Sequence, residues 1–191
     1  MTVDSLATER LRLRRWRIED LDDLSAVFAH PEVWWFPFGR GWSVEETERF
    51  LRRRLEEQDT RGWTQWAAET RDERLIGYVG LSPPTFLPEV MPTVEVGWRL
   101  DPSYWGQGLA TEGASAALAH GFDDLGLPEI VSICQPDNTR SERVMKRLGM
   151  HLDHDTCHPT LGIPLRVYRI SRAGWLAAPP DRIASPDHPP H

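Results

Sequence analysis

The stretch Trp105-Gly106-Gln107-Gly108-Leu109-Ala110-Thr111-Glu112 decides the fold of this 191-residue chain. It follows a segment with strand character, residues 93–100, and precedes a segment in which apolar residues recur at helical spacing, residues 114–125. Two glycines two positions apart let the backbone approach a ligand closely, and a helix that begins there directs unpaired N–H groups outward. We therefore expect an anion site at this turn, although a plain strand-to-helix connection uses the same glycines. The spacing matches neither a P-loop nor the full dinucleotide fingerprint.

The composition is that of a folded, acidic protein. Hydrophobic residues make up 40% of the chain, nine residues are tryptophan and the net charge is −7. The length suits one domain with a single core, and the negative charge argues against a general nucleic-acid binder while it suits a cationic or amine substrate. No apolar run is long enough to cross a bilayer and the first residues lack the features of a signal peptide, so we expect a cytoplasmic protein. The two cysteines, Cys134 and Cys157, are expected to be reduced.

Periodicity and punctuation divide the chain into strands and helices. Alternating apolar and charged residues predict a strand over residues 8–16, and helical spacing predicts a helix over residues 18–28. Ser43 and Glu46 form a capping-box pattern, which predicts the start of another helix. Further strands are predicted at residues 63–70, 74–81, 93–100, 129–134, 151–155 and 165–170, with a short helix at residues 139–148. We expect one domain over residues 1–176 and a disordered tail that contains proline and histidine over residues 177–191.

An aromatic segment, residues 32–42, has no clean period. It holds five aromatic residues, among them Trp34, Trp35 and Phe38, with proline and glycine between them. Two interpretations stay open: a loop packed against the core or a partner subunit, or the wall of a substrate pocket. Under the second interpretation, Trp34, Trp35 and Phe38 contact the substrate.

Taken together, these patterns resemble a known family. The order of elements, the turn at residues 105–110, Asn138-Thr139-Arg140-Ser141 and Lys146-Arg147-Leu148-Gly149-Met150 are similar to the GNAT superfamily of N-acetyltransferases, and within it to the RimJ/RimL type, which acetylates protein N-termini. The resemblance covers residues 8–175. It implies a single-domain α/β (α+β) fold with a mixed, mostly antiparallel twisted sheet, flanking helices and two central strands that splay apart.

The same resemblance implies an acetyl-CoA site. The pyrophosphate would lie on the main-chain N–H groups of the turn, which comprises Trp105, Gly106, Gln107, Gly108, Leu109, Ala110 and Thr111. Trp105 stands where the family pattern has Gln or Arg. The pantetheine arm would lie along Trp98, Arg99 and Leu100, and Asn138 would hydrogen-bond it.

Acetyl transfer to an amine needs a base for the amine proton and a proton for the departing thiolate. Glu95 is our candidate base, because burial within a strand would raise the pKa of its carboxyl group; a solvated or ion-paired strand residue is the alternative. Backbone N–H groups near Val96 to Trp98 would polarise the thioester carbonyl, as the resemblance implies. Many family members have a tyrosine that protonates the thiolate, and Met145 occupies the matching position here. The resemblance makes Ser141 the expected substitute; the alternative is that its hydroxyl group only caps the start of a helix.

The sequence gives weaker evidence for a metal site. His151, His154, Cys157 and His158 suggest a zinc site by their spacing, but on a strand they would face opposite ways, so we expect no metal. The function we expect is acetyl transfer from acetyl-CoA to a primary amine by direct attack in a ternary complex, with a protein N-terminal α-amine as acceptor. An aminoglycoside- or polyamine-type small amine, or a noncatalytic acyl-CoA-binding module, are the alternatives. Exposed aromatic residues would suit a homodimer.

Overall fold

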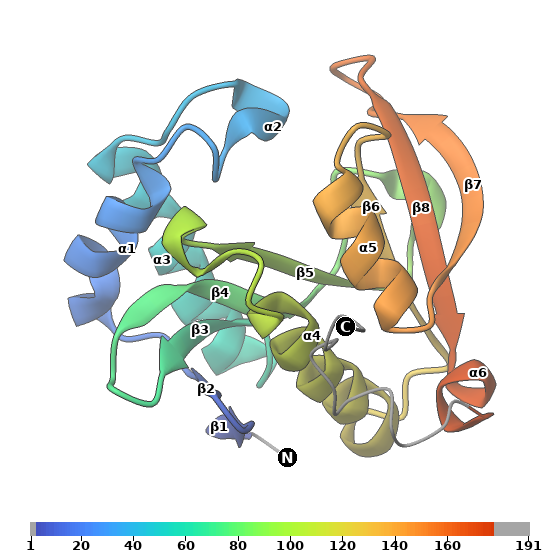
Figure 1. Ribbon diagram of the computed structural model, residues 1–191, viewed down its shortest axis with the longest axis horizontal. Helices are drawn as coiled ribbons and strands as arrows, with labels where there is room; N and C mark the ends of the chain where they lie inside the picture. Colours follow the sequence, from blue (N-terminus) through green and yellow to red (C-terminus); the bar gives the residue numbers. More distant parts are fainter. Residues whose placement is uncertain (1–2, 178–191) are drawn as a thin grey trace, which may run out of the picture.

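One eight-stranded sheet runs through the protein, in the order β1-β2-β3-β4-β5-β6-β8-β7 (Figure 1). The computed structural model describes residues 3–177, without the side chains of Trp35 and Phe38, so residues 178–191 of the expected tail lie outside the described residues. The strands are β1 (Ser5–Ala7), β2 (Leu11–Arg14), β3 (Gln65–Thr70), β4 (Leu75–Ser82), β5 (Val94–Leu100), β6 (Glu129–Cys134), β7 (His151–Cys157) and β8 (Pro164–Ser171). Every neighbouring pair is antiparallel except β5 and β6.

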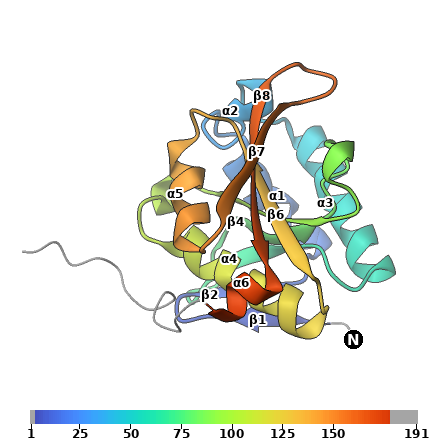
Figure 2. The ribbon, with the colours of Figure 1, turned by 90° about the vertical axis from the view of Figure 1, so that its right-hand side faces the viewer.

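Helices cover both faces of the sheet. They are α1 (Leu21–Phe28), α2 (Trp35–Phe38), α3 (Val44–Thr60), α4 (Leu109–Ala119), α5 (Thr139–Arg147) and α6 (Arg172–Ala177). α4 packs on one face of β2, β4 and β5, while α1 and α3 pack together on the other face. Figure 2 shows α5 beside β6 and β8, with α6 at the end of β8. None of the described helices is both long enough and apolar enough to cross a membrane.

The sheet opens between its two parallel strands. β5 and β6 are paired only at Val94 with Ile130 and at Glu95 with Val131. Beyond Glu95, β5 stays paired with β4 on one side but has no strand partner on the other among residues 3–177, and the two parallel strands diverge in Figure 1. The expected splay is therefore confirmed, and it begins at Glu95.

The predicted elements are present, with several differences. β1, α6 and the short helix α2 were not predicted, because the two helices have fewer than two turns and β1 has three residues, too few for alternation to be recognised. α4 continues into a π-helical turn, His120–Asp124, and buries Ser115. In α5, Met145 and Leu148 are buried, and Val144 is partly buried. Ser43 caps α3 through a bond from Glu46 N–H to its hydroxyl group, as predicted.

Candidate active site

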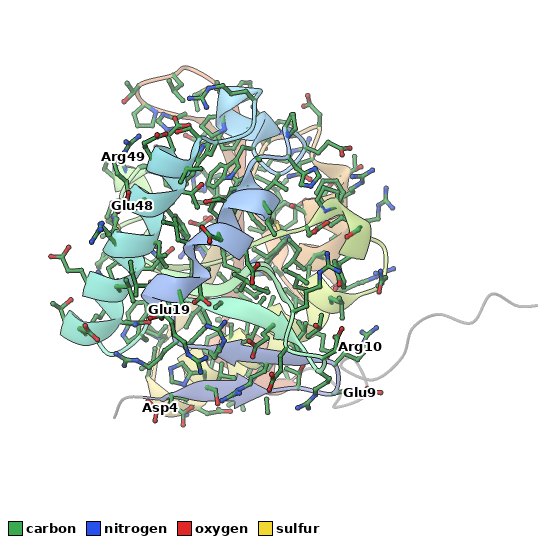
Figure 3. The ribbon with its side chains drawn as sticks, turned by 90° about the vertical axis from the view of Figure 1, so that its left-hand side faces the viewer. Asp4, Glu9, Arg10, Glu19, Glu48 and Arg49 are labelled. Atoms are coloured by element: carbon green, nitrogen blue, oxygen red, sulfur yellow. The ribbon has the colours of Figure 1, made fainter. Side chains whose placement is uncertain are left out.

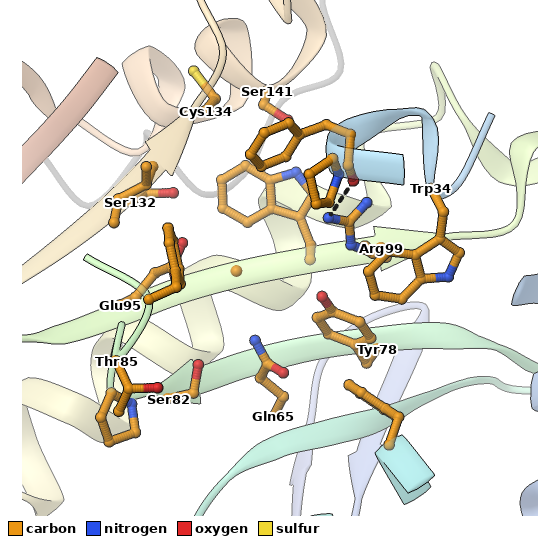
Figure 4. Close-up of a pocket in the computed structure, with 18 of the residues that line it drawn as sticks. Trp34, Gln65, Tyr78, Ser82, Thr85, Glu95, Arg99, Ser132, Cys134 and Ser141 are labelled. Atoms are coloured by element: carbon orange, nitrogen blue, oxygen red, sulfur yellow. Dashed lines mark hydrogen bonds between the residues drawn. The ribbon is translucent and has the colours of Figure 1, made fainter. Parts of the chain in front are cut away.

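The opening in the sheet lies beside a cavity of about 470 Å³. Because side chains alternate along a strand, one face of β3, β4 and β5 supplies the cavity floor. Its residues pair across the sheet: Glu95 with Ser82, Arg99 with Tyr78, and Gly97 with Gly80, which in turn pairs with Gln65. The floor comprises Gln65, Tyr78, Ser82, Glu95, Gly97 and Arg99 (Figure 4).

Glu95 lies at the point where β5 and β6 separate. Its side chain is half-buried, and its accessible part faces the cavity. Removal from bulk water raises the pKa of Glu95 to about 8, against the opposing effects of the Arg99 charge and a hydrogen bond from Ile133 N–H. A carboxyl group with that pKa can accept a proton near neutral pH.

The opposite wall of the cavity comes from β6 and the start of α5. Cys134, Asn138, Ser141 and Met145 line it, and Figure 4 shows Ser141 and Cys134 across the cavity from Glu95. Asn138 is the N-cap of α5: its Oδ1 accepts the Ser141 N–H at 3.1 Å, which leaves its amide N–H groups to donate elsewhere. Burial raises the pKa of the Cys134 thiol to about 11, so this cysteine stays a neutral thiol.

The aromatic segment forms a third wall. Trp34 is only 5% exposed, stacks on Trp42 at 3.5 Å between ring centroids and also lines the cavity. Arg99 holds this segment over the floor: its guanidinium lies 3.9 Å from the centre of the Trp34 ring and donates to the carbonyl groups of Val33 and Phe36. Trp34 therefore belongs both to the core and to the cavity wall, and its contact with the substrate stays a prediction.

The glycine turn sits at the N-terminus of α4. Gly106 and Gly108 have φ values of 77° and 81°, a region that suits glycine, and Gly108 begins the helix without a side-chain cap. The N–H groups of the next three residues therefore point out of the helix end, and the Thr111 hydroxyl group is buried without a hydrogen-bond partner within the described part of the chain. These donors fit a pyrophosphate group.

Contacts from both sides brace this turn. Arg10 donates to the Gln107 carbonyl group at 2.7 Å and pairs with Glu112 in the first turn of α4. The Arg140 guanidinium lies 4.7 Å from the centre of the Trp105 ring, which joins the turn to α5. The two segments that carried the family resemblance are therefore adjacent in space.

The predicted site residues whose side chains are described fall into three groups. Glu95, Ser141, Asn138, Trp98, Arg99 and Trp34 line the cavity, whereas Trp105, Gly106, Gln107, Gly108, Ala110 and Thr111 form the turn outside it. Leu100 and Leu109 are buried in the core, so they can offer a ligand only their backbone groups. Arg99 was assigned to the pantetheine arm through its backbone, which stays a prediction, and its guanidinium binds the aromatic segment. The side chains of Trp35 and Phe38 lie outside the described residues.

Sequence reasoning missed several residues of the cavity. Gln65 and Tyr78 are in the predicted strands at residues 63–70 and 74–81, and Arg54 is on the helix whose start was predicted at Ser43. A polar residue at an inward position of an amphipathic element was the available signal. Among residues 3–177 no cluster of three His, Cys, Asp or Glu side chains is placed to hold a metal ion; His154 contacts Asp153 and Glu89.

Comparisons with known proteins agree with this geometry. A family model described as an Acetyltransferase (GNAT) domain matches residues 10–151. The chain is 28% identical over 146 residues to the uncharacterized N-acetyltransferase YoaA of Bacillus subtilis (strain 168), a match that covers 75% of this chain and 81% of that protein. A shorter match, 47% identical over 58 residues, links it to the uncharacterized N-acetyltransferase YnaD of the same strain and covers 30% of this chain and 34% of that protein.

Solved structures share the fold. A GNAT-family acetyltransferase from Bacillus anthracis is 25% identical with a TM-score of 0.75, and the match covers 88% of this chain and 99% of that one. RimL, a ribosomal L7/L12 α-N-protein acetyltransferase solved with coenzyme A, has a TM-score of 0.71 at 18% identity and covers 87% and 97%. The family model spans most of the chain, and the match to YoaA extends over a similar length. The chain therefore belongs to the GNAT family of N-acetyltransferases, with a fold shared by the RimL type.

Proposed function

We propose that this enzyme transfers an acetyl group from acetyl-CoA to a protein N-terminal α-amine, by direct attack in a ternary complex. The observation that carries the proposal is a carboxyl group with a raised pKa, Glu95, at the point where the parallel strands separate and opposite Ser141. Family membership supports acetyl transfer, and the protein named in the RimL structure acts on a protein N-terminus.

The residues divide the proposed reaction between them. The neutral amine attacks the thioester carbonyl carbon, and Glu95 takes the proton that its nitrogen loses, directly or through water, as the new C–N bond forms and the C–S bond breaks. Ser141 donates its hydroxyl proton to the departing thiolate and takes a proton from water in return. The α4 N-terminus, with the Thr111 hydroxyl group, would bind the pyrophosphate, and the unpaired edge of β5 beyond Glu95 would bind the pantetheine amides.

A panel of acceptors tests the proposal. Thiol release from acetyl-CoA should be fastest with peptides that have a free N-terminus, absent with the same peptides N-acetylated, and slower with free polyamines or aminoglycosides. Preference for a small amine over every peptide would move the acceptor to the small-molecule class, for which a cavity of about 470 Å³ has a suitable size. Tight acetyl-CoA binding without turnover on any amine would contradict the proposal as a whole.

A further inference from the structure

The cavity carries a surplus of positive charge in a protein whose net charge is −7. Three arginines line the cavity, Arg53, Arg54 and Arg99, against two carboxylates, Glu57 and Glu95. In the described part of the chain, Arg99 contacts the Val33 and Phe36 carbonyl groups, the Trp34 ring and the Tyr78 hydroxyl group, and it forms no salt bridge with a carboxylate. The charge of the whole protein therefore does not describe the charge of the cavity.

The cationic end of the cavity consists of Arg53 and Arg54 on α3, and Arg54 is the more deeply buried of the two. It is 6% exposed and donates to Gln65 Oε1 at 2.9 Å and to Glu57 Oε1 at 3.1 Å, while its Nε atom is buried without a hydrogen-bond partner in the described part of the chain. Glu57 is shared, because Arg53 and the Thr64 hydroxyl group also donate to it. One carboxylate thus serves two guanidinium groups. Burial lowers the pKa of Arg54 and the nearby Arg53 charge acts in the same direction, as expected for an incompletely compensated cation.

A groove continues the same charge to the surface. It is lined by Trp42, Glu46, Arg49, Phe50, Arg53 and Arg54, four of which also line the main cavity. Glu46 is neutralised by two bonds from Arg40, at 2.6 and 2.7 Å. Arg49 and Arg53 are four residues apart on one face of α3, and Figure 3 shows Arg49 near the upper end of that helix.

The register of the sheet gives the distance between the two ends. Gly97 is two residues beyond Glu95 on β5, about 7 Å along the strand. Gln65 reaches across to Gly97, its Nε2 atom 3.4 Å from where a side chain would begin there, and its other amide atom accepts from Arg54. The Arg54 guanidinium therefore lies on the order of 10 Å from the Glu95 carboxyl group, about the length of two to three extended residues.

We propose that the acceptor is an amine that carries a carboxylate about two residues away, with the amine at Glu95 and the carboxylate at Arg53 and Arg54. This inference rests on the proposed function and narrows its acceptor class to acidic N-terminal segments, such as a peptide with an acidic second residue. Guanidinium groups suit this role because they bind carboxylates with two parallel hydrogen bonds. Arg53, whose side chain is 60% exposed, offers these donors, and the buried and incompletely compensated charge of Arg54 adds to the attraction.

Three amidated peptides, Ala-Glu-Gly, Ala-Gln-Gly and Ala-Lys-Gly, test the inference through thiol release from acetyl-CoA. We expect kcat/KM for the glutamate peptide to exceed that for the glutamine peptide about tenfold, with the lysine peptide lowest, and the preference to shrink as salt is raised. Equal values for the three peptides, with turnover present, would overturn the inference and leave acetyl transfer standing. Absence of turnover on all amines would overturn both.

Variants on α3 separate a binding role from a general effect of charge. Arg53 has a side chain 60% exposed, so Arg53→Gln should fold, and it should reduce the glutamate-to-glutamine ratio severalfold. Arg52→Gln is the matched control: Arg52 is 66% exposed on the same helix and pairs with Glu48 outside the cavity, and its loss should leave the ratio unchanged. An unchanged ratio in Arg53→Gln, or an equal fall in Arg52→Gln, would contradict the inference.

Discussion

At the scale of single residues, Glu95 combines a chemical advantage with a cost in stability. The surroundings that raise its pKa to about 8 do so by disfavouring the ionised carboxylate. The Glu95 carboxyl group must ionise before it can accept a proton, and its ionised form destabilises the fold. This conflict between stability and activity is typical of residues that take part in proton transfer.

Because ionised Glu95 destabilises the fold, the difference in free energy of unfolding between Glu95→Gln and wild type should depend on pH. Because the folded state holds the Glu95 proton more tightly than the unfolded state does, its contribution to stability is complete below pH 4.5 and is lost as the pH rises to about 8. Glu95→Gln cannot ionise, so its free energy of unfolding should rise relative to wild type between pH 5 and pH 8.5, by up to about 1.4 kcal/mol per pH unit. Urea unfolding followed by tryptophan fluorescence measures this difference. A difference that stays constant with pH would show that Glu95 ionises normally.

Ser141 makes a separate prediction about the proton for the thiolate. Ser141→Ala should lower kcat roughly tenfold, less than the ~10²–10⁴ typical of an irreplaceable acid or base, because water can reach the cavity. Thr139→Ala is the control: Thr139 is exposed at the start of the same helix and does not line the cavity. If both variants lose the same activity, Ser141 acts by shaping α5 rather than through its hydroxyl group.

At the scale of elements, Arg99 fastens the aromatic segment to β5. A guanidinium group can donate to the Val33 and Phe36 carbonyl groups at the same time, whereas a lysine ammonium is a single point charge without this planar fork. Arg99→Lys should therefore raise KM for the acceptor several-fold and leave KM for acetyl-CoA nearly unchanged.

A suitable control for Arg99→Lys is Arg61→Lys. Arg61 also lies over a tryptophan, Trp63 at 4.9 Å, but it is outside the cavity. Steady-state kinetics with each substrate varied in turn gives both constants. A rise in KM for acetyl-CoA alone would contradict this prediction and would indicate that the Arg99 side chain contributes to acetyl-CoA binding.

The turn before α4 makes a prediction about the other substrate. At Gly108 the φ value of 81° disfavours any residue with a side chain, so Gly108→Ala should cost about 1 kcal/mol of stability and weaken CoA binding, measured by calorimetry. Gly162→Ala imposes similar strain, with φ of 65° and open space around it, in the loop between β7 and β8. It should lose comparable stability and keep the affinity for CoA. Equal affinities in both variants would mean that the turn does not bind the donor.

At the scale of the whole molecule, the order of elements could be predicted because it follows from local patterns. Alternation predicted β2, the capping box located the start of α3, and the two glycines marked the beginning of α4. These signals depend on neighbours within a few residues of one another. The family resemblance added the splay between β5 and β6, which no local pattern contains.

The part of the site that depends on tertiary packing could not be predicted. Arg54 sits on a helix whose apolar pattern is complete without it, and only the fold brings it beside Gln65 on β3. Arg99 was assigned by its position on β5, whereas its contacts come from residues more than sixty positions away. The net charge of −7 favoured a cationic acceptor. Composition, however, averages over the whole protein and does not show that three arginines line the cavity.

The central claim is that Glu95 accepts the proton of an acceptor amine in acetyl transfer. The most direct measurement is the pH dependence of kcat/KM for thiol release from acetyl-CoA, for wild type and Glu95→Gln, with an amine that remains neutral over the whole range. We predict a rise in the wild type with an apparent pKa near 8, and in Glu95→Gln a much lower rate without that rise. The same rate and the same profile in both proteins would contradict the account.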